Sequence, residues 1–191
     1  MGLSRFGIMG VGVVAALAGG VTARPALAET CPAATTCDTT VVFSVSTAQG
    51  LAISVPDGPV GIGTGAAGDQ ISGSLGSVTV SDERAALVAT WVATVSGTSF
   101  TTGGGSGAET IPAGAISYWS GPATSTTGTG TFVPGQPNAA SAKHLHAPYT
   151  AFSKISGSGD NSCTWNPTIV VDIPDGAVAG TYTGTISHSV A

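Results

Sequence analysis

The chain has 191 residues, of which 42% are hydrophobic and only 8% are charged, and its formal net charge is −5. The scarcity of lysine and arginine excludes a basic surface for nucleic acid or for an anionic membrane, and the hydrophobic content excludes a largely disordered chain. A chain of this length can bury enough surface for one self-sufficient core.

Residues 1–28 show the order of features that is typical of a secretory signal peptide. Arg5 supplies a positive charge, residues 6–21 are apolar and uncharged, and residues 25–28 end in the small-x-small pattern of a cleavage site. We therefore expect cleavage after Ala28, an extracellular location, and a mature chain without a membrane anchor.

Residues 29–39 form a short N-terminal segment that contains two of the three cysteines. Cys31 and Cys37 are candidates for a disulfide in an oxidising compartment, where the small loop they close would contribute roughly 2 kcal/mol. Pairing of either residue with Cys163 stays open on the sequence alone. If it is unpaired, we expect Cys163 to be a buried, unreactive thiol, because no cation lies near it in sequence to lower its pKa.

From residue 40 onward, apolar and polar residues alternate in short runs that are separated by glycine, proline, asparagine and aspartate. This period of two predicts strands rather than helices. The expected strands cover residues 40–47, 51–55, 77–81, 87–96, 116–120, 130–133, 149–155, 164–173 and 181–190. The glycine-rich residues 103–107, residues 125–130 and residues 134–142 are expected to be loops.

Most of these runs have one apolar face and one face of threonine and serine. The predicted apolar faces comprise Leu87, Ala89, Trp91, Ala93 and Val95; Trp165, Ile169, Val171 and Ile173; and Tyr182, Ile186, His188 and Val190. This pattern predicts an all-β fold, a single antiparallel β-sandwich of residues 40–191, whose apolar faces meet while the hydroxyl faces stay in water. Tyr182 follows a Pro-Asp-Gly turn and resembles the tyrosine corner of immunoglobulin-like sandwiches, which implies a hydrogen bond from its hydroxyl to upstream backbone.

The residues that could carry chemistry are scattered. Asp82 and Glu83 are neighbours, so on a strand they point to opposite faces and cannot act as a facing pair. Arg84 is expected to form a local surface ion pair with Asp82. His144 and His146 have strand spacing and could bind zinc or copper with a third ligand, which keeps a metal-dependent enzyme as an alternative. Our main expectation is a protein without catalytic residues, metal or cofactor.

Three aromatic residues allow two interpretations. Tyr118, Trp119 and Trp165 either pack in the core, which is the commoner role of such side chains, or form an exposed platform for sugars.

Part of the sequence resembles a known family of surface domains. Leu75-Gly76 with Val78, Val80, Asp82 and Arg84, followed by residues 91–96 and Phe100, is similar to the proximal half of WxL domains, and residues 174–190 are similar to their distal half. The resemblance implies a β-sandwich of Gram-positive bacteria that binds the cell wall non-covalently through peptidoglycan.

The resemblance also implies wall-binding positions, at the two Trp-x-Leu motifs of the family. Trp91 is retained, whereas Ala93 stands at the first leucine position, and His188 and Val190 stand at the second tryptophan and leucine positions. The pattern that determines the fold is thus kept better than the pattern associated with wall binding.

The leading hypothesis is a secreted, non-enzymatic surface protein that associates non-covalently with a cell-wall polymer. The alternative is an interaction or structural module that pairs with another surface protein through exposed sheet edges. The metal-dependent enzyme is the second alternative.

Overall fold

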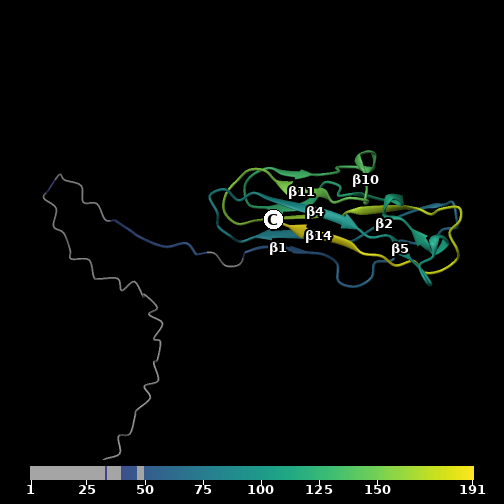
Figure 1. Ribbon diagram of the computed structural model, residues 1–191. Coiled ribbons are helices and arrows are strands. Elements are labelled where there is room, and N and C mark those ends of the chain that lie inside the picture. Colours follow the sequence, from purple (N-terminus) through teal and green to yellow (C-terminus); the bar gives the residue numbers. More distant parts are fainter. Residues whose placement is uncertain (1–32, 34–39, 47–49) are drawn as a thin grey trace, which may run out of the picture. The chain divides into compact units, whose positions relative to one another are not determined.

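The computed structural model describes residue 33, residues 40–46 and residues 50–191 (Figure 1). The strands belong to a compact unit that extends from Ser44 to Ala191. In the described part of the chain the only helices are single 3-10 turns, and none of them is long enough to cross a membrane. The expected cleavage site, Cys31 and Cys37 lie outside the described residues, so the signal peptide and the disulfide remain predictions.

Within the described residues, fourteen strands form three four-stranded antiparallel sheets and one two-stranded ribbon. The first sheet has the order β1-β3-β12-β8 (Leu51–Ser54, Val78–Asp82, Asn161–Trp165, Ala123–Thr127). The second has the order β10-β7-β13-β2 (Lys143–His144, Ile116–Trp119, Thr168–Asp172, Gln70–Ser74). The third has the order β14-β4-β11-β9 (Ile186–Val190, Trp91–Gly97, Tyr149–Lys154, Phe132–Pro134), and the ribbon pairs β5 with β6 (Phe100–Thr101, Thr110–Ile111). The 3-10 turns are Gly107–Glu109, Ala113–Ala115 and Ala139–Ser141.

The first two sheets are the halves of one bent layer. Strand β2 continues into β3, β7 into β8, and β12 into β13, each after a break of two or three residues. The breaks contain Gly76 and Gly121, both with positive φ, and Pro167, whose carbonyl accepts a hydrogen bond from Leu75 N at 2.9 Å. Because proline lacks an N–H and the two glycines take left-handed conformations, all three strands bend at the same level. The third sheet is the other layer, and its strands β4, β11 and β14 are seen side by side in Figure 1.

The core lies between the two layers. The bent layer contributes Val78, Val80, Ile116, Tyr118, Cys163, Trp165, Ile169 and Val171, and the third sheet contributes Trp91, Ala93, Val95, Ala151 and Phe152. Trp165 and Phe152 stack across the interface with ring centroids 5.0 Å apart. Large aromatic side chains that meet in this way dominate the apolar area buried in a core. The predicted all-β sandwich is therefore confirmed.

Several predicted strands agree with the structure, and the differences have physical reasons. Residues 40–46 form no strand, and Val41, Val42, Phe43 and Val45 are exposed. The predicted strand 87–96 begins only at Trp91, and Leu87 is 89% exposed instead of buried. Alternation alone cannot distinguish a strand from an extended segment that lacks a neighbour to pair with.

Two other errors concern proline and threonine. The predicted strand 164–173 is two strands, because Asn166 and Pro167 interrupt the hydrogen-bond ladder between β12 and β13. Half of the predicted loop 125–130 is strand, since β8 extends to Thr127.

The expected tyrosine corner is confirmed. The Tyr182 hydroxyl lies 2.9 Å from Val178 O and 3.1 Å from Ala108 O, so it can donate to backbone four residues upstream. Thr183 forms an isolated antiparallel bridge with Thr101 nearby. The contacts anchor the long segment between β13 and β14 to the β5-β6 ribbon.

Candidate functional site

The outer surface of the first sheet carries two rows of hydroxyl groups. One row runs across the strands through Ala52, Ser81, Ser162 and Thr127, and the other through Ser54, Thr79, Thr164 and Ser125. Their neighbours along β3 and β12 are buried, so alternation directs these side chains outward. We call the seven serine and threonine residues of these rows the hydroxyl face.

Hydrogen bonds between neighbouring strands order part of the hydroxyl face. Thr79 Oγ1 lies 2.9 Å from Thr164 Oγ1, and Thr127 Oγ1 lies 2.8 Å from Ser162 Oγ. Each hydroxyl has one donor and two acceptor positions, so such a pair keeps capacity for further hydrogen bonds. Strands lie about 4.8 Å apart and residues i and i+2 about 6.7 Å apart, which gives a regular, uncharged array of polar groups.

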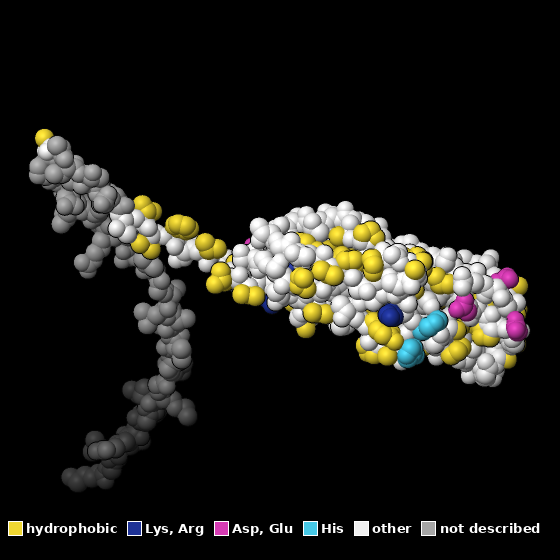
Figure 2. Space-filling view, turned by 90° about the horizontal axis from the view of Figure 1, so that it is seen from above, with side chains coloured by type: hydrophobic (Ala, Val, Ile, Leu, Met, Phe, Trp, Pro, Cys, Tyr) yellow, Lys and Arg dark blue, Asp and Glu magenta, His cyan; other side chains and the backbone are white. Residues whose placement is uncertain are grey.

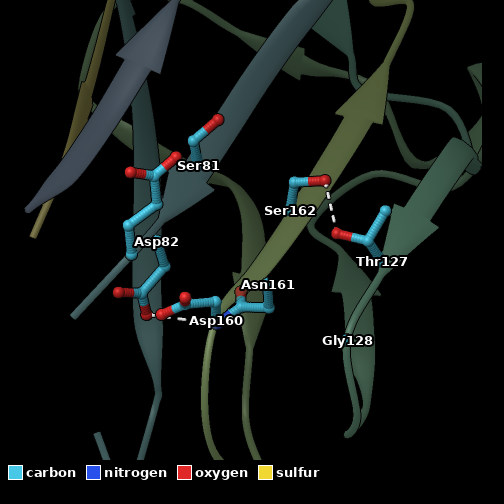
Figure 3. A pocket seen from close by; sticks show the side chains of 8 residues that line it. Ser81, Asp82, Thr127, Gly128, Asp160, Asn161 and Ser162 are labelled. Carbon is cyan, nitrogen blue, oxygen red and sulfur yellow. Dashed lines mark hydrogen bonds between the residues drawn. The ribbon is translucent and has the colours of Figure 1, made fainter. Parts of the chain in front are cut away.

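An open hollow of about 550 Å³ adjoins one end of the hydroxyl face (Figure 3). Ser81, Ser162 and Thr127 line it together with Asp82, Glu83, Gly128, Asp160 and Asn161. Figure 3 shows two hydrogen bonds between residues that line the hollow. One joins Thr127 and Ser162, and the other joins Asp82 and Asn161. Among the described residues no set of three histidine, cysteine, aspartate or glutamate side chains is placed to hold a metal ion.

The Asp82 carboxylate is the centre of a buried polar network beside this hollow. Its side chain is fully buried and accepts two hydrogen bonds from the Arg84 side chain, from Nε at 2.7 Å and from Nη2 at 2.8 Å, and one from Arg84 N at 3.2 Å. Asn161 Nδ2 donates to it at 3.2 Å, and Asn161 Oδ1 accepts from Trp91 Nε1 at 2.9 Å. The hydrogen bonds from Arg84 lower the pKa of Asp82, so the carboxylate stays ionised in the core. The predicted ion pair exists, but its acid is buried and not at the surface.

Hydrogen bonds from the network connect the beginning of the loop of residues 84–90 to its end. Arg84 Nη2 donates to Thr90 O at 2.9 Å, and Asp160 Oδ1 accepts from Ala85 N at 2.9 Å. Ala85 has a φ of +48°, which is unusual for a residue with a side chain and persists only where surrounding contacts impose it. The loop presents Leu87 at its surface, which explains why that residue is absent from the core.

Lys154 is a second charge in the same region, and no carboxylate of the described residues forms an ion pair with it. Its side chain is 1% exposed, its Nζ donates to Ala89 O at 2.7 Å, and it lies 5.8 Å from the centroid of the Phe132 ring. Burial lowers the pKa of Lys154, because removing the ammonium from water disfavours the charged form.

We expect Lys154→Met to raise the free energy of unfolding by about 1 kcal/mol, because methionine fills similar space without a buried charge. Urea unfolding at pH 7 measures the change, and Lys143→Met, at an exposed lysine, is the matched control. A decrease of more than about 1 kcal/mol would show that the hydrogen bond to Ala89 O outweighs the cost of desolvation.

A chain of three hydrogen-bonded side chains crosses the middle of the core. Trp165 Nε1 donates to the Tyr118 hydroxyl at 3.3 Å, and the Tyr118 hydroxyl lies 3.1 Å from His188 Nε2. The Tyr118 hydroxyl accepts from the indole and can donate its own proton to His188 Nε2 in the tautomer that carries the histidine proton on Nδ1. Burial lowers the pKa of His188 to about 4 and raises the pKa of Tyr118.

The four WxL-motif positions come together on two paired strands. Trp91 and Ala93 lie on β4, His188 and Val190 lie on β14, and Val190 is the partner of Ala93. Trp91 and Ala93 are buried in the core, and His188 and Val190 are half-buried. Ala93 and Val190 are therefore a cross-strand pair, and the wall-binding role of the four positions remains a prediction.

The two loop histidines are exposed and do not share a site. His144 Nδ1 lies 3.1 Å from Ser117 Oγ, and His146 Nε2 lies 3.3 Å from the Tyr149 hydroxyl. Leu145 between them is buried. In the part of the chain that the structure describes, neither histidine belongs to a group of three ligands.

Cys163 and two of the three candidate platform aromatics lie in the core. Cys163 is a free, buried thiol, as predicted, and burial raises its pKa to about 12. Tyr118 and Trp165 are fully buried, whereas Trp119 is half-buried on the outer surface of the second sheet. Core packing is thus confirmed for two of the three residues and is wrong for Trp119.

No family model matches the chain, and no curated protein matches it. Its function is therefore inferred from the arrangement of its residues.

The sequence indicated the polar outer faces of single strands, but not which strands combine to form the hydroxyl face. The alternating serines and threonines of β3 and β12 indicated polar outer faces, but not that the two strands are neighbours. Strand β8 was missed because Ala-Thr-Ser-Thr-Thr followed by glycine also fits a flexible loop.

Proposed function

We propose that the protein is a secreted, non-enzymatic module that associates non-covalently with a cell-wall polymer, and that the hydroxyl face is its contact surface. The observation that carries this proposal is the ordered, uncharged array of seven hydroxyl-bearing side chains across four strands. The expected signal peptide and the resemblance to WxL domains support the extracellular and wall-associated setting.

The chemistry of the face suits a polymer of sugars. Sugar hydroxyls, like those of serine and threonine, both donate and accept hydrogen bonds, so the two surfaces can satisfy one another or share bridging waters. The chain as a whole carries few charged side chains, and few are visible on the side of the molecule that Figure 2 shows. Many weak contacts along a repeating polymer add through effective concentration, so no single contact needs to be strong.

One observation favours the alternative of a protein-binding module. Strand β8 is an edge strand of the first sheet, and residues 124–127 are exposed. It contains no proline and no charged residue. An edge with these properties is a template for a strand from another protein. Binding to a secreted partner protein but not to purified wall would favour this alternative.

The proposal is tested by co-sedimentation with purified cell wall. We expect Ser162→Glu combined with Thr164→Glu to reduce the bound fraction at least tenfold, because the added carboxylates replace hydroxyls at the centre of the face. Thr94→Glu combined with Ser189→Glu is the matched control, since it alters a hydroxyl pair 2.7 Å apart on the opposite layer with the same change in charge. Equal binding by the wild type and both variants, or no binding by the wild type, would contradict the proposal.

A further inference from the structure

Trp119 lies in a hollow on the same outer surface as the hydroxyl face, on the other half of the bent layer. Its cross-strand partner is Thr168, and the adjacent row joins Ser72, Val170 and Ser117. The hollow has a volume of about 320 Å³ and is lined by Gln70, Ser72, Ser117, Trp119, Ala139, Ala142 and Val170. An aromatic side chain that stays half-exposed among small and polar residues is available to a ligand.

We propose that this hollow binds one pyranose residue of an uncharged glycan, with the sugar ring packed against the Trp119 indole. The inference rests on the proposed function and names the part of the polymer that the protein recognises. A pyranose ring has a face of C–H groups and a rim of hydroxyls, and an indole ring has a negative face that attracts such C–H groups.

The lining residues divide in the way that such a ring requires. Trp119, Val170 and the two alanines provide apolar surface, and Ser72, Ser117 and Gln70 provide hydrogen-bonding groups. Gln70 Nε2 donates to Asp172 Oδ1 at 2.6 Å, which fixes the amide and leaves Gln70 Oε1 available as an acceptor. A small number of polar groups around an apolar floor, in a volume of a few hundred Å³, is typical of small-ligand sites.

The place of the hollow on the layer explains how one polymer could use both surfaces. Strands β2, β7 and β13 form the hollow and continue into β3, β8 and β12, which carry the hydroxyl face. A glycan held at Trp119 can therefore extend along the same strands to the hydroxyl rows. The hollow would supply the preference for a sugar ring, and the hydroxyl face would supply further contacts.

Tryptophan fluorescence of the full mature chain tests the inference directly. The chain has three tryptophans, of which Trp91 and Trp165 are buried, so acrylamide quenches mainly Trp119. With the N-acetylglucosamine tetramer as the probe, we expect a blue shift of the emission and at least a twofold decrease in quenching of the wild type. Calorimetry should show at least tenfold weaker binding for Trp119→Ala than for the wild type, with most of the affinity retained by Trp119→Phe.

Two further measurements keep the test independent of folding and of the proposed function. Thermal unfolding shows whether Trp119→Ala is folded. If Trp119→Ala is unfolded, Gln70→Ala replaces it in the test, because it removes only a rim group of the hollow, and it should weaken binding of the tetramer severalfold. The inference would be overturned if the tetramer changed neither the quenching nor the calorimetric heat of the wild type. It would also be overturned if a wall stem peptide bound in place of the tetramer. If wild type and Trp119→Ala then sediment equally with cell wall, the proposed function stands without this site; if the wild type does not sediment, the proposed function itself is wrong.

Discussion

Replacing Asp82 by alanine is expected to lower the free energy of unfolding by about 3 kcal/mol at pH 7, close to the cost of breaking a buried ion pair. The fully buried Asp82 carboxylate accepts two side-chain hydrogen bonds from Arg84 and one from Asn161. Its removal leaves Arg84 Nε without an acceptor, while Arg84 Nη2 keeps Thr90 O and Asn161 Nδ2 keeps Gly159 O. Arg84 is about one third exposed and can partly rehydrate, so the expected loss lies at the lower end for buried pairs.

The effect of Asp82→Ala should extend to the loop of residues 84–90. Arg84 also donates to Thr90 O, so an arginine that turns towards water releases this contact as well. We therefore expect Asp82→Ala to accelerate hydrogen exchange of the backbone amides in this loop relative to the wild type. The acceleration should be larger than that of strand β13, which lies in the other sheet of the layer.

Urea unfolding with a matched carboxylate measures this prediction. Asp172→Ala removes an exposed carboxylate whose side-chain partner is Gln70, and should change the free energy of unfolding by less than about 1 kcal/mol. The low pKa of Asp82 means that its contribution is present at neutral pH and is lost as pH falls through the folded-state value. A loss equal to that of the control would show that the buried pair contributes no net stability.

The fold class was predictable because burial follows the alternation of side chains. Along β4, Trp91, Ala93 and Val95 are buried and Val92 is exposed, as the period of two requires. The positions of the strand ends were less predictable, since they depend on what lies beside each strand. Leu87 continues the same alternation, but its loop is held by Arg84 and has no strand to pair with.

The candidate site was less predictable than the fold, because it depends on register. The sequence placed hydroxyls on outer faces, and the pairing of Thr79 with Thr164 and of Ser162 with Thr127 is what makes them an array. Asp82 and Arg84 were expected to pair because they are two positions apart and so point to the same side of an extended chain. The burial of Asp82 was not expected, since Asn161, which donates to its carboxylate, lies on a strand that is distant in sequence.

Acidification from pH 7 to pH 4 is expected to lower the free energy of unfolding by up to about 3 kcal/mol through His188. Burial lowers the pKa of His188 to about 4 in the folded protein, against 6.5 as its ordinary value. Between these two values the unfolded chain binds a proton that the folded protein does not, so stability falls as the pH falls. Below about pH 4 both states are protonated and this contribution changes no further.

Burial is the reason why His188 resists protonation, and the hydrogen-bonded chain in the core shows which side chains surround the ring. Its Nε2 accepts the Tyr118 proton, and Tyr118 in turn accepts from Trp165, so a proton on Nε2 would leave the Tyr118 hydroxyl facing a second donor. His188→Gln keeps an acceptor at this position without a titratable ring, and the dependence of its unfolding midpoint on pH between 6.5 and 4 should be flatter than that of the wild type. The control is substitution of glutamine at the exposed His144 and His146, which should leave the dependence of the unfolding midpoint on pH as it is in the wild type. If His188→Gln shows the same dependence as the wild type, the acid sensitivity belongs to other groups.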